Sequence, residues 1–170
     1  MVPQKQFDHL IRSFSALPNE CRHWQLVILG EGPERSKLEA LIDEHEIGNK
    51  VCLPGKVENV SGWYEKAEIF VLSSEYEGFP NTLAEAMSYG LPTVSYDCDT
   101  GPSELIESGV NGFLVESNDE ESLSRHILEL IHNDRLRARI GKSAEQVRST
   151  FEPREIMKLW TRLLLGTNTL

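Results

Sequence analysis

Two glutamates flank the start of a predicted helix, at a spacing that could bind a phosphorylated ligand. The apolar run 69–72 predicts a buried strand, and good helix formers follow from Leu83 onward. Pro80 suits the first helical turn, so strand, loop and helix are predicted in succession. In an open α/β sheet, ligands bind at the carboxyl ends of the strands, which is where this loop begins.

The start of this helix is predicted to be an anion site. The N–H groups of Asn81, Thr82 and Leu83 are expected to be free, and together with the helix dipole they suit phosphate. Glu85 follows one turn later, where its carboxylate could reach a ribose diol beside the phosphate. Glu77, in the loop, would face the group at the other end of the phosphates. These residues alone leave open that Glu85 only complements the helix dipole and that Glu77 is a solvated loop acid.

A longer series of motifs surrounds these acids and resembles a known family. Residues 73–87 read Ser-Ser-Glu-Tyr-Glu-Gly-Phe-Pro-Asn-Thr-Leu-Ala-Glu-Ala-Met, and Gly-Leu-Pro-Thr-Val follows at 90–94. Asp-Cys-Asp-Thr-Gly-Pro-Ser-Glu at 97–104 and Glu-Ser-Gly-Val-Asn-Gly-Phe-Leu-Val at 107–115 complete the series. In order and spacing these segments resemble the donor-binding domain of retaining glycosyltransferases of family 4, the C-terminal half of a GT-B enzyme. The resemblance covers nearly the whole chain.

The resemblance implies roles for individual residues. Glu77 would be catalytic, through contact with the sugar hydroxyls, and Glu85 would bind the ribose. The other implied donor-binding positions are Lys5, Val57, Gly78, Phe79, Asn81 and Thr82. Lys5 and the helix amides would bind the phosphates, and backbone groups near Val57 would bind the base. The Val57 loop is expected to lie beside the Glu77 loop in one parallel sheet. No metal site and no cofactor are predicted.

The resemblance also predicts that the chain is one domain of a longer enzyme. Family members have a strand ending in Gly-Arg just before the residues that match Met1 to Lys5, and they use that arginine on the diphosphate. The predicted domain therefore covers residues 1–170, without its first strand and without the N-terminal acceptor domain. The isolated chain is expected to be inactive.

Composition narrows the class of protein. A length of 170 residues predicts one domain with a sizeable core. We expect neither a signal peptide nor a membrane span, because the sequence shows no run of about 18 apolar residues. The net charge of −10 argues against a nucleic-acid partner. The cysteines and histidines lack metal-ligand spacing, and the scattered thiols fit the cytoplasm. A peripheral position at the inner face of the membrane, through the missing domain, is left open.

Strands alternate with helices, which predicts a Rossmann-like parallel sheet with helices on both faces. Strands are expected at 24–29, 51–53, 69–72, 93–96 and 112–115. Helices are expected at 6–17, 33–46, 60–67, 102–107, 119–132, 134–149 and from 153 onward. Trp63 and Tyr64 are expected to pack against the core. The last helix resembles the family's closing helix, which crosses back to the other domain.

The function implied is transfer of a sugar from a nucleotide diphosphate sugar to an acceptor, with retention of anomeric configuration. The 97–102 segment is reminiscent of members that build bacterial surface polysaccharides. The acceptor stays open, with a lipid-linked molecule as one candidate. Two alternatives also stay open, namely a sugar-nucleotide epimerase on the same two-domain plan and a non-catalytic nucleotide-binding module.

Overall fold

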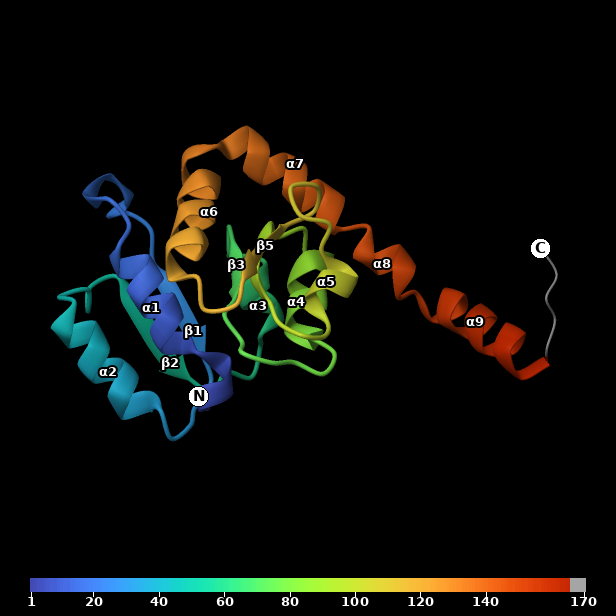
Figure 1. Ribbon diagram of the computed structural model, residues 1–170, viewed down its shortest axis with the longest axis horizontal. Coiled ribbons are helices and arrows are strands. Elements are labelled where there is room, and N and C mark those ends of the chain that lie inside the picture. The colour runs from blue at the N-terminus through green and yellow to red at the C-terminus, as the bar shows by residue number, and fades with distance from the viewer. Residues whose placement is uncertain (166–170) are drawn as a thin grey trace.

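The computed structural model describes residues 1–165, so the last five residues of the predicted domain lie outside it (Figure 1). The strands are β1 (Leu26–Leu29), β2 (Val51–Gly55), β3 (Phe70–Leu72), β4 (Thr93–Asp97) and β5 (Phe113–Glu116). The helices are α1 (Phe7–Ser15), α2 (Arg35–Glu44), α3 (Ser61–Tyr64), α4 (Asn81–Ser88), α5 (Pro102–Leu105), α6 (Glu120–His132), α7 (Asp134–Ala144), α8 (Val147–Thr150) and α9 (Pro153–Leu165). Short 3-10 turns occupy Pro3–Lys5 and Asn19–Cys21. With the exception of α7 and α8, these elements match the predicted ones to within a few residues.

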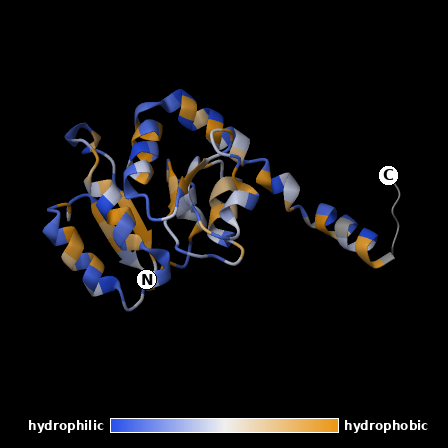
Figure 2. Ribbon diagram, viewed as in Figure 1, coloured by the Kyte–Doolittle hydropathy of each residue, from blue (hydrophilic) through white to orange (hydrophobic). Residues whose placement is uncertain are grey.

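The strands are parallel and helices cover both of their faces, which confirms the predicted Rossmann-like fold. Successive side chains of a strand point to opposite faces, and the core follows this alternation. Val94, Phe113 and Val115 pack in one cluster with the buried residues of α1 and α6. Leu114, between the last two, packs in a second cluster with Leu72 and the apolar residues of α4. β1 and β3 are apolar along their length, whereas β4 also carries Thr93, Ser95 and Asp97 (Figure 2).

The strands do not form one continuous sheet, which corrects the predicted arrangement. Within residues 1–165, β1 pairs only with β2, and β3 pairs only with β4, which also pairs with β5. Hydrogen-bonded strands lie about 4.8 Å apart, and no described strand of one sheet has a partner in the other at that spacing. The prediction that the Val57 loop lies beside the Glu77 loop in one sheet is therefore wrong. A single hydrophobic core nevertheless includes residues of both sheets.

The strands β1 and β3 each keep an edge without strand partners among the described residues. Val27 and Leu29 in β1, and Phe70 and Val71 in β3, are only partly buried. Apolar side chains in the middle of a covered parallel sheet are normally buried on both faces. These strands are thus less enclosed than β4, where four of the five residues are buried.

The predicted helix 134–149 is two helices, α7 and α8. The Glu145 N–H still bonds to the carbonyl of Gly141, four residues back, whereas the Gln146 N–H bonds to Ser143, three residues back. This tightening to 3-10 geometry ends α7, and α8 begins at the next residue. The sequence has no proline or glycine at this point, so no local residue type signals the break.

Gly141 brings α7 against the backbone of the turn after α4. A Cβ atom added at this glycine would collide with the carbonyl oxygen of Gly90, which cannot move as a side chain can. We expect Gly141→Ala to lower the free energy of unfolding by about 1–2 kcal/mol, since overpacking outweighs the better helix propensity of alanine. Thermal or denaturant unfolding measures the change. Gly48→Ala is the control, because its nearest non-neighbouring atom is 3.9 Å away. Equal stabilities of the two variants would contradict the expected collision.

The last described helix, α9, extends away from the sheet layers together with α8 (Figure 1). Its apolar side chains Met157, Trp160, Leu163 and Leu164 are between 54% and 75% exposed. Figure 2 shows apolar and polar residues interleaved along this helix. None of the described helices is both long enough and apolar enough to cross a membrane.

Candidate functional site

The N-terminal segment is tied to the loop after β3, which brings Lys5 beside Glu77. The carbonyl of Gln4 accepts a hydrogen bond from the backbone N–H of Glu75 at 2.9 Å. The carbonyl of Lys5 accepts one from the hydroxyl of Ser73 at 2.8 Å. The Lys5 ammonium then lies 2.7 Å from Oε1 of Glu77, across 72 residues of sequence. Two of the predicted site residues are therefore in direct contact.

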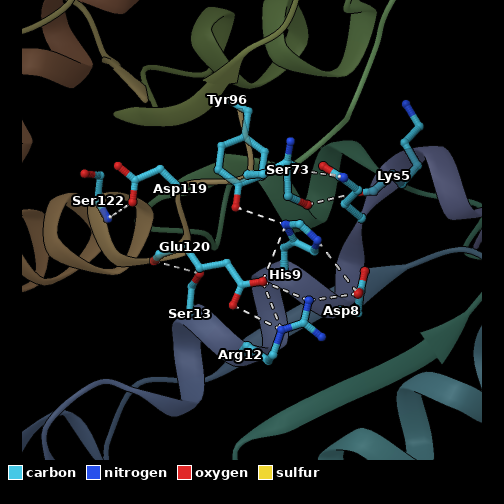
Figure 3. A network of polar contacts seen from close by, with 12 residues as sticks. Lys5, Asp8, His9, Arg12, Ser13, Ser73, Tyr96, Asp119, Glu120 and Ser122 are labelled. Carbon is cyan, nitrogen blue, oxygen red and sulfur yellow. Dashed lines mark hydrogen bonds and ion pairs between the residues drawn. The ribbon is translucent and has the colours of Figure 1, made fainter. Parts of the chain in front are cut away.

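A network of polar contacts holds α1, the helix that follows Lys5 (Figure 3). Arg12 donates to both carboxylate oxygens of Glu120, with Nε at 3.0 and 3.1 Å and Nη2 at 2.8 Å from Oε1. These hydrogen bonds raise the pKa of Arg12, which stays charged. The His9 ring lies 3.4 Å from the hydroxyl of the buried Tyr96. The contacts hold α1 against α6 and β4, and so keep the N-terminal segment in place.

Glu77 is largely enclosed by its own loop and by its neighbours. Its side chain is 10% exposed, whereas that of Lys5 is 33% exposed. Its carbonyl accepts a hydrogen bond from the hydroxyl of Thr100, in the loop after β4, at 2.6 Å. In that loop Gly101 has a φ of +99°, and an added Cβ would lie 2.6 Å from Cδ of Pro80. The loops at the carboxyl ends of β3 and β4 therefore meet, as expected for neighbouring parallel strands.

The start of α4 differs from the prediction of three free amides. Pro80 precedes the helix with a ψ of 73°, instead of occupying its first turn. The Asn81 N–H donates to the carbonyl of Phe79 at 2.9 Å, and the Leu83 N–H donates to that of Pro80 at 3.0 Å. Of the three amides, only that of Thr82 has no hydrogen-bond partner within residues 1–165. The carbonyls of the preceding turn fold over the helix start and occupy two of the expected donors.

Glu85 lies one turn into α4 and is exposed, but its carboxylate is held by a neighbour. The hydroxyl of Tyr64, in α3, donates to Oε2 of Glu85 at 3.1 Å. The Tyr64 ring is only 9% exposed and packs against Tyr89 and Phe70. The sequence predicted that Tyr64 packs, but it did not predict the hydrogen bond, because no local pattern joins residues 21 positions apart.

The remaining predicted residues lie in two places. Gly78 and Phe79 are exposed in the loop before α4, and the Phe79 ring lies edge-on to that of Phe151, 5.3 Å away. The structure thus gathers Lys5 and residues 77–85 into one region. Val57 is partly buried in the loop after β2, a strand of the other sheet, and its role in binding the base stays a prediction.

The chemistry of this region suits a ligand with both negative charge and hydroxyl groups. Lys5 and the Thr82 amide can bind phosphate oxygens. The carboxylates of Glu77 and Glu85 can accept hydrogen bonds from hydroxyls. Within the described residues, no three His, Cys, Asp or Glu side chains lie where they could together hold a metal ion.

The chain belongs to the family described as glycosyl transferases group 1, whose sequence profile matches residues 1–147. The match includes every described strand and every residue of the candidate site. The fold and the sequence therefore agree on the class of protein.

Two relatives are similar to nearly the whole of this chain. The chain is 38% identical over 165 residues to an exopolysaccharide phosphotransferase of Streptomyces coelicolor, with 96% of this chain and 17% of the relative covered. It is 30% identical over 164 residues to a poly(ribitol-phosphate) alpha-N-acetylglucosaminyltransferase of Staphylococcus aureus, covering 96% of this chain and 33% of the relative. The chain thus spans a third or less of these two proteins.

A solved structure of a related protein has a closely similar fold. A mutant form of TarM from S. aureus, in complex with fondaparinux, alpha-GlcNAc-glycerol and UDP, superposes with a TM-score of 0.90 at 29% identity. The match covers 99% of this chain and 34% of that one.

Proposed function

We propose that this chain is the donor-binding domain of a retaining glycosyltransferase of family 4. The complete enzyme would transfer a sugar from a nucleotide diphosphate sugar to an acceptor. The observation that carries the proposal is the contact between Lys5 and Glu77 next to the start of α4. The contact supports the proposal because a lysine that could bind phosphate and a carboxylate that could accept sugar hydroxyls meet beside the start of α4, although Lys5 is distant from Glu77 in sequence.

Each group has a proposed role in the reaction. Lys5 and the Thr82 amide bind the diphosphate and stabilise the negative charge that grows on it as the sugar leaves. Glu77 orients the sugar through its hydroxyls, and Glu85 binds the ribose. Lys5 contacts Glu77 in the structure, so it moves from the carboxylate to the phosphates when the donor binds. Retention of configuration relies here on positioning and on stabilisation of the leaving group.

The proposal also covers the organisation of the complete protein. The unpaired edges of β1 and β3, with their half-buried apolar residues, favour a further strand between the two sheets. A second domain would supply the acceptor site, and the exposed apolar face of α9 would pack against that domain. A lipid-linked acceptor would bring such an enzyme to the inner face of the membrane.

The names of the relatives support a donor of this class. One similar structure, of a protein 29% identical in sequence to this chain, contains UDP. Another relative is named as an N-acetylglucosaminyltransferase. A phosphotransferase activity is not proposed for this chain, which covers only 17% of the relative that has that name.

The full-length natural protein, assayed with a panel of nucleotide sugars, tests the proposal. Transfer to an acceptor, with an α-linked product from an α-linked donor, is the expected result. Formation of an epimer of the donor would identify a sugar-nucleotide epimerase instead. Binding of nucleotide without turnover of any donor or acceptor offered would support the non-catalytic alternative.

Glu85→Ala is expected to weaken binding of the nucleoside diphosphate by about 1.5–3 kcal/mol, the range for hydrogen bonds to a charged group. The reason is that its carboxylate accepts the ribose hydroxyls. Isothermal calorimetry measures the change, and inorganic pyrophosphate, which has no ribose, is the control ligand. Unchanged affinity in a folded variant would leave Glu85 with only its effect on the helix dipole.

A further inference from the structure

The hydroxyl of Tyr64 is a buried polar group whose contact with Glu85 the proposed reaction does not use. Tyr64 is 9% exposed, and its ring packs against those of Phe70 and Tyr89. Its hydroxyl reaches Oε2 of Glu85 at 3.1 Å and the carbonyl of Thr82 at 3.4 Å. A phenol has a single proton to donate, and the shorter distance and the negative charge favour the carboxylate.

The helix that carries Tyr64 is continuous with the loop after β2. The side chain of Asn59 accepts a hydrogen bond from the N–H of Gly62 at 3.1 Å, which fixes the start of α3. Tyr64 follows two residues later, at the end of this short helix. A path of fixed contacts thus runs from the Val57 loop, through α3, to the carboxylate on α4.

We propose that Tyr64 is a positioning residue that holds Glu85 in the orientation in which it accepts the ribose hydroxyls. The inference rests on the proposed function, because it assumes that Glu85 binds ribose. It adds a residue of α3 to the site. It also links the loop proposed for the base to the acid proposed for the ribose.

The physical reason lies in the exposure of Glu85. An exposed glutamate samples many rotamers, and ordering it at the moment of binding costs affinity. A buried phenol that donates to Oε2 removes part of that freedom and leaves Oε1 open to a ligand. Burial and the charge of Glu85 raise the pKa of Tyr64, so the hydroxyl stays a donor throughout the physiological range.

The test compares four variants of the full-length natural protein, Tyr64→Phe, Glu85→Gln, the double variant and Tyr89→Phe. Tyr89→Phe is the matched control, because it removes the hydroxyl of the ring that packs on Tyr64 and keeps the backbone hydrogen bond from Tyr89 to the Glu85 carbonyl. Calorimetry would measure the binding of UDP, and of 2′,3′-dideoxy-UDP, which lacks the ribose diol. If another base binds more tightly, the corresponding pair of nucleotides replaces them.

We expect Tyr64→Phe to weaken UDP binding about two- to tenfold, the scale of one hydrogen bond. Binding of the dideoxy nucleotide should change by less than about twofold, since it has no diol to meet Glu85. The double variant should bind UDP no more weakly than Glu85→Gln alone. Tyr89→Phe should match the unmodified protein.

Each contrary outcome has a definite meaning. Equal losses for UDP and the dideoxy nucleotide, or additive losses in the double variant, would make Tyr64 a structural residue only and overturn the inference. An effect of Glu85→Gln without any effect of Tyr64→Phe would overturn the inference and leave the proposed function intact. If Glu85→Gln leaves the affinity for UDP unchanged, or if no nucleoside diphosphate binds, the proposed ribose site is wrong. The inference about Tyr64 is then wrong as well.

Discussion

Replacing Glu77 with alanine is expected to lower sugar transfer about 10²- to 10³-fold, the scale for removing one preorganised electrostatic group from a reacting centre. The carboxylate is 10% exposed, and the Thr100 hydroxyl holds the backbone carbonyl of Glu77, so the loop is ordered before the donor arrives. Its proposed partners are the sugar hydroxyls, which the free nucleoside diphosphate lacks. The affinity for that nucleotide should therefore change by no more than about fivefold, since a partly exposed ion pair contributes roughly 1 kcal/mol or less.

Steady-state kinetics and calorimetry on the full-length protein separate these effects. Glu75→Ala is the control, because Glu75 is exposed in the same loop and its hydrogen bond to the N-terminal segment is made by the backbone N–H, which alanine keeps. Lys5→Ala should show the opposite pattern, with a clear loss of nucleotide affinity. Equal losses of transfer and nucleotide binding in Glu77→Ala would place Glu77 in the nucleotide site and remove its proposed role at the sugar.

Residues 1–170 produced alone are expected to show no measurable transfer under conditions in which the complete enzyme turns over. The candidate residues are all proposed to bind the donor. A second domain would provide the acceptor site, and its closure would exclude water from the reacting centre. The same fragment carrying Glu77→Ala sets the background of the assay. Transfer by the fragment above that background would overturn its assignment as the donor half.

Nucleotide binding by the fragment offers an independent measure of the same proposal. A form extended by a strand ending in Gly-Arg is expected to bind the nucleoside diphosphate more tightly, because the arginine adds a second cation to the diphosphate site. It should also resist unfolding better, because the strand would pair with the edges of β1 and β3. An extended form with unchanged affinity and stability would contradict the proposed place of that strand.

The sequence predicted the elements of the fold because they depend on local patterns. Apolar runs identified the strands, and periodic leucines and isoleucines identified α1, α2 and α6. The helix break at Gln146 escaped prediction because it rests on hydrogen-bond geometry, without a glycine or proline to mark it. The division into two sheets was also not predicted, because the order of strands and the pairing of their edges depend on the whole chain.

The sequence likewise predicted some features of the candidate site and not others. Glu77, Asn81 and Glu85 stand out because one motif contains them. The contact of Lys5 with Glu77 joins elements 72 residues apart, and no local pattern of residues encodes that distance. The hydrogen bonds of the Asn81 and Leu83 amides depend on the φ and ψ angles around Pro80, which residue types do not determine.

The separation of β1–β2 from β3–β4–β5 divides the backbone amides into two hydrogen-bond ladders. Native-state hydrogen exchange can then proceed by opening one ladder while the other stays closed, because within residues 1–165 no strand of one sheet pairs with a strand of the other. Lys5 precedes α1, which packs on β1, whereas Thr82 lies in the first turn of α4, which packs on β3. A diphosphate held by both would connect the two ladders, so its binding energy would slow exchange in β1–β2 and in β3–β5 together.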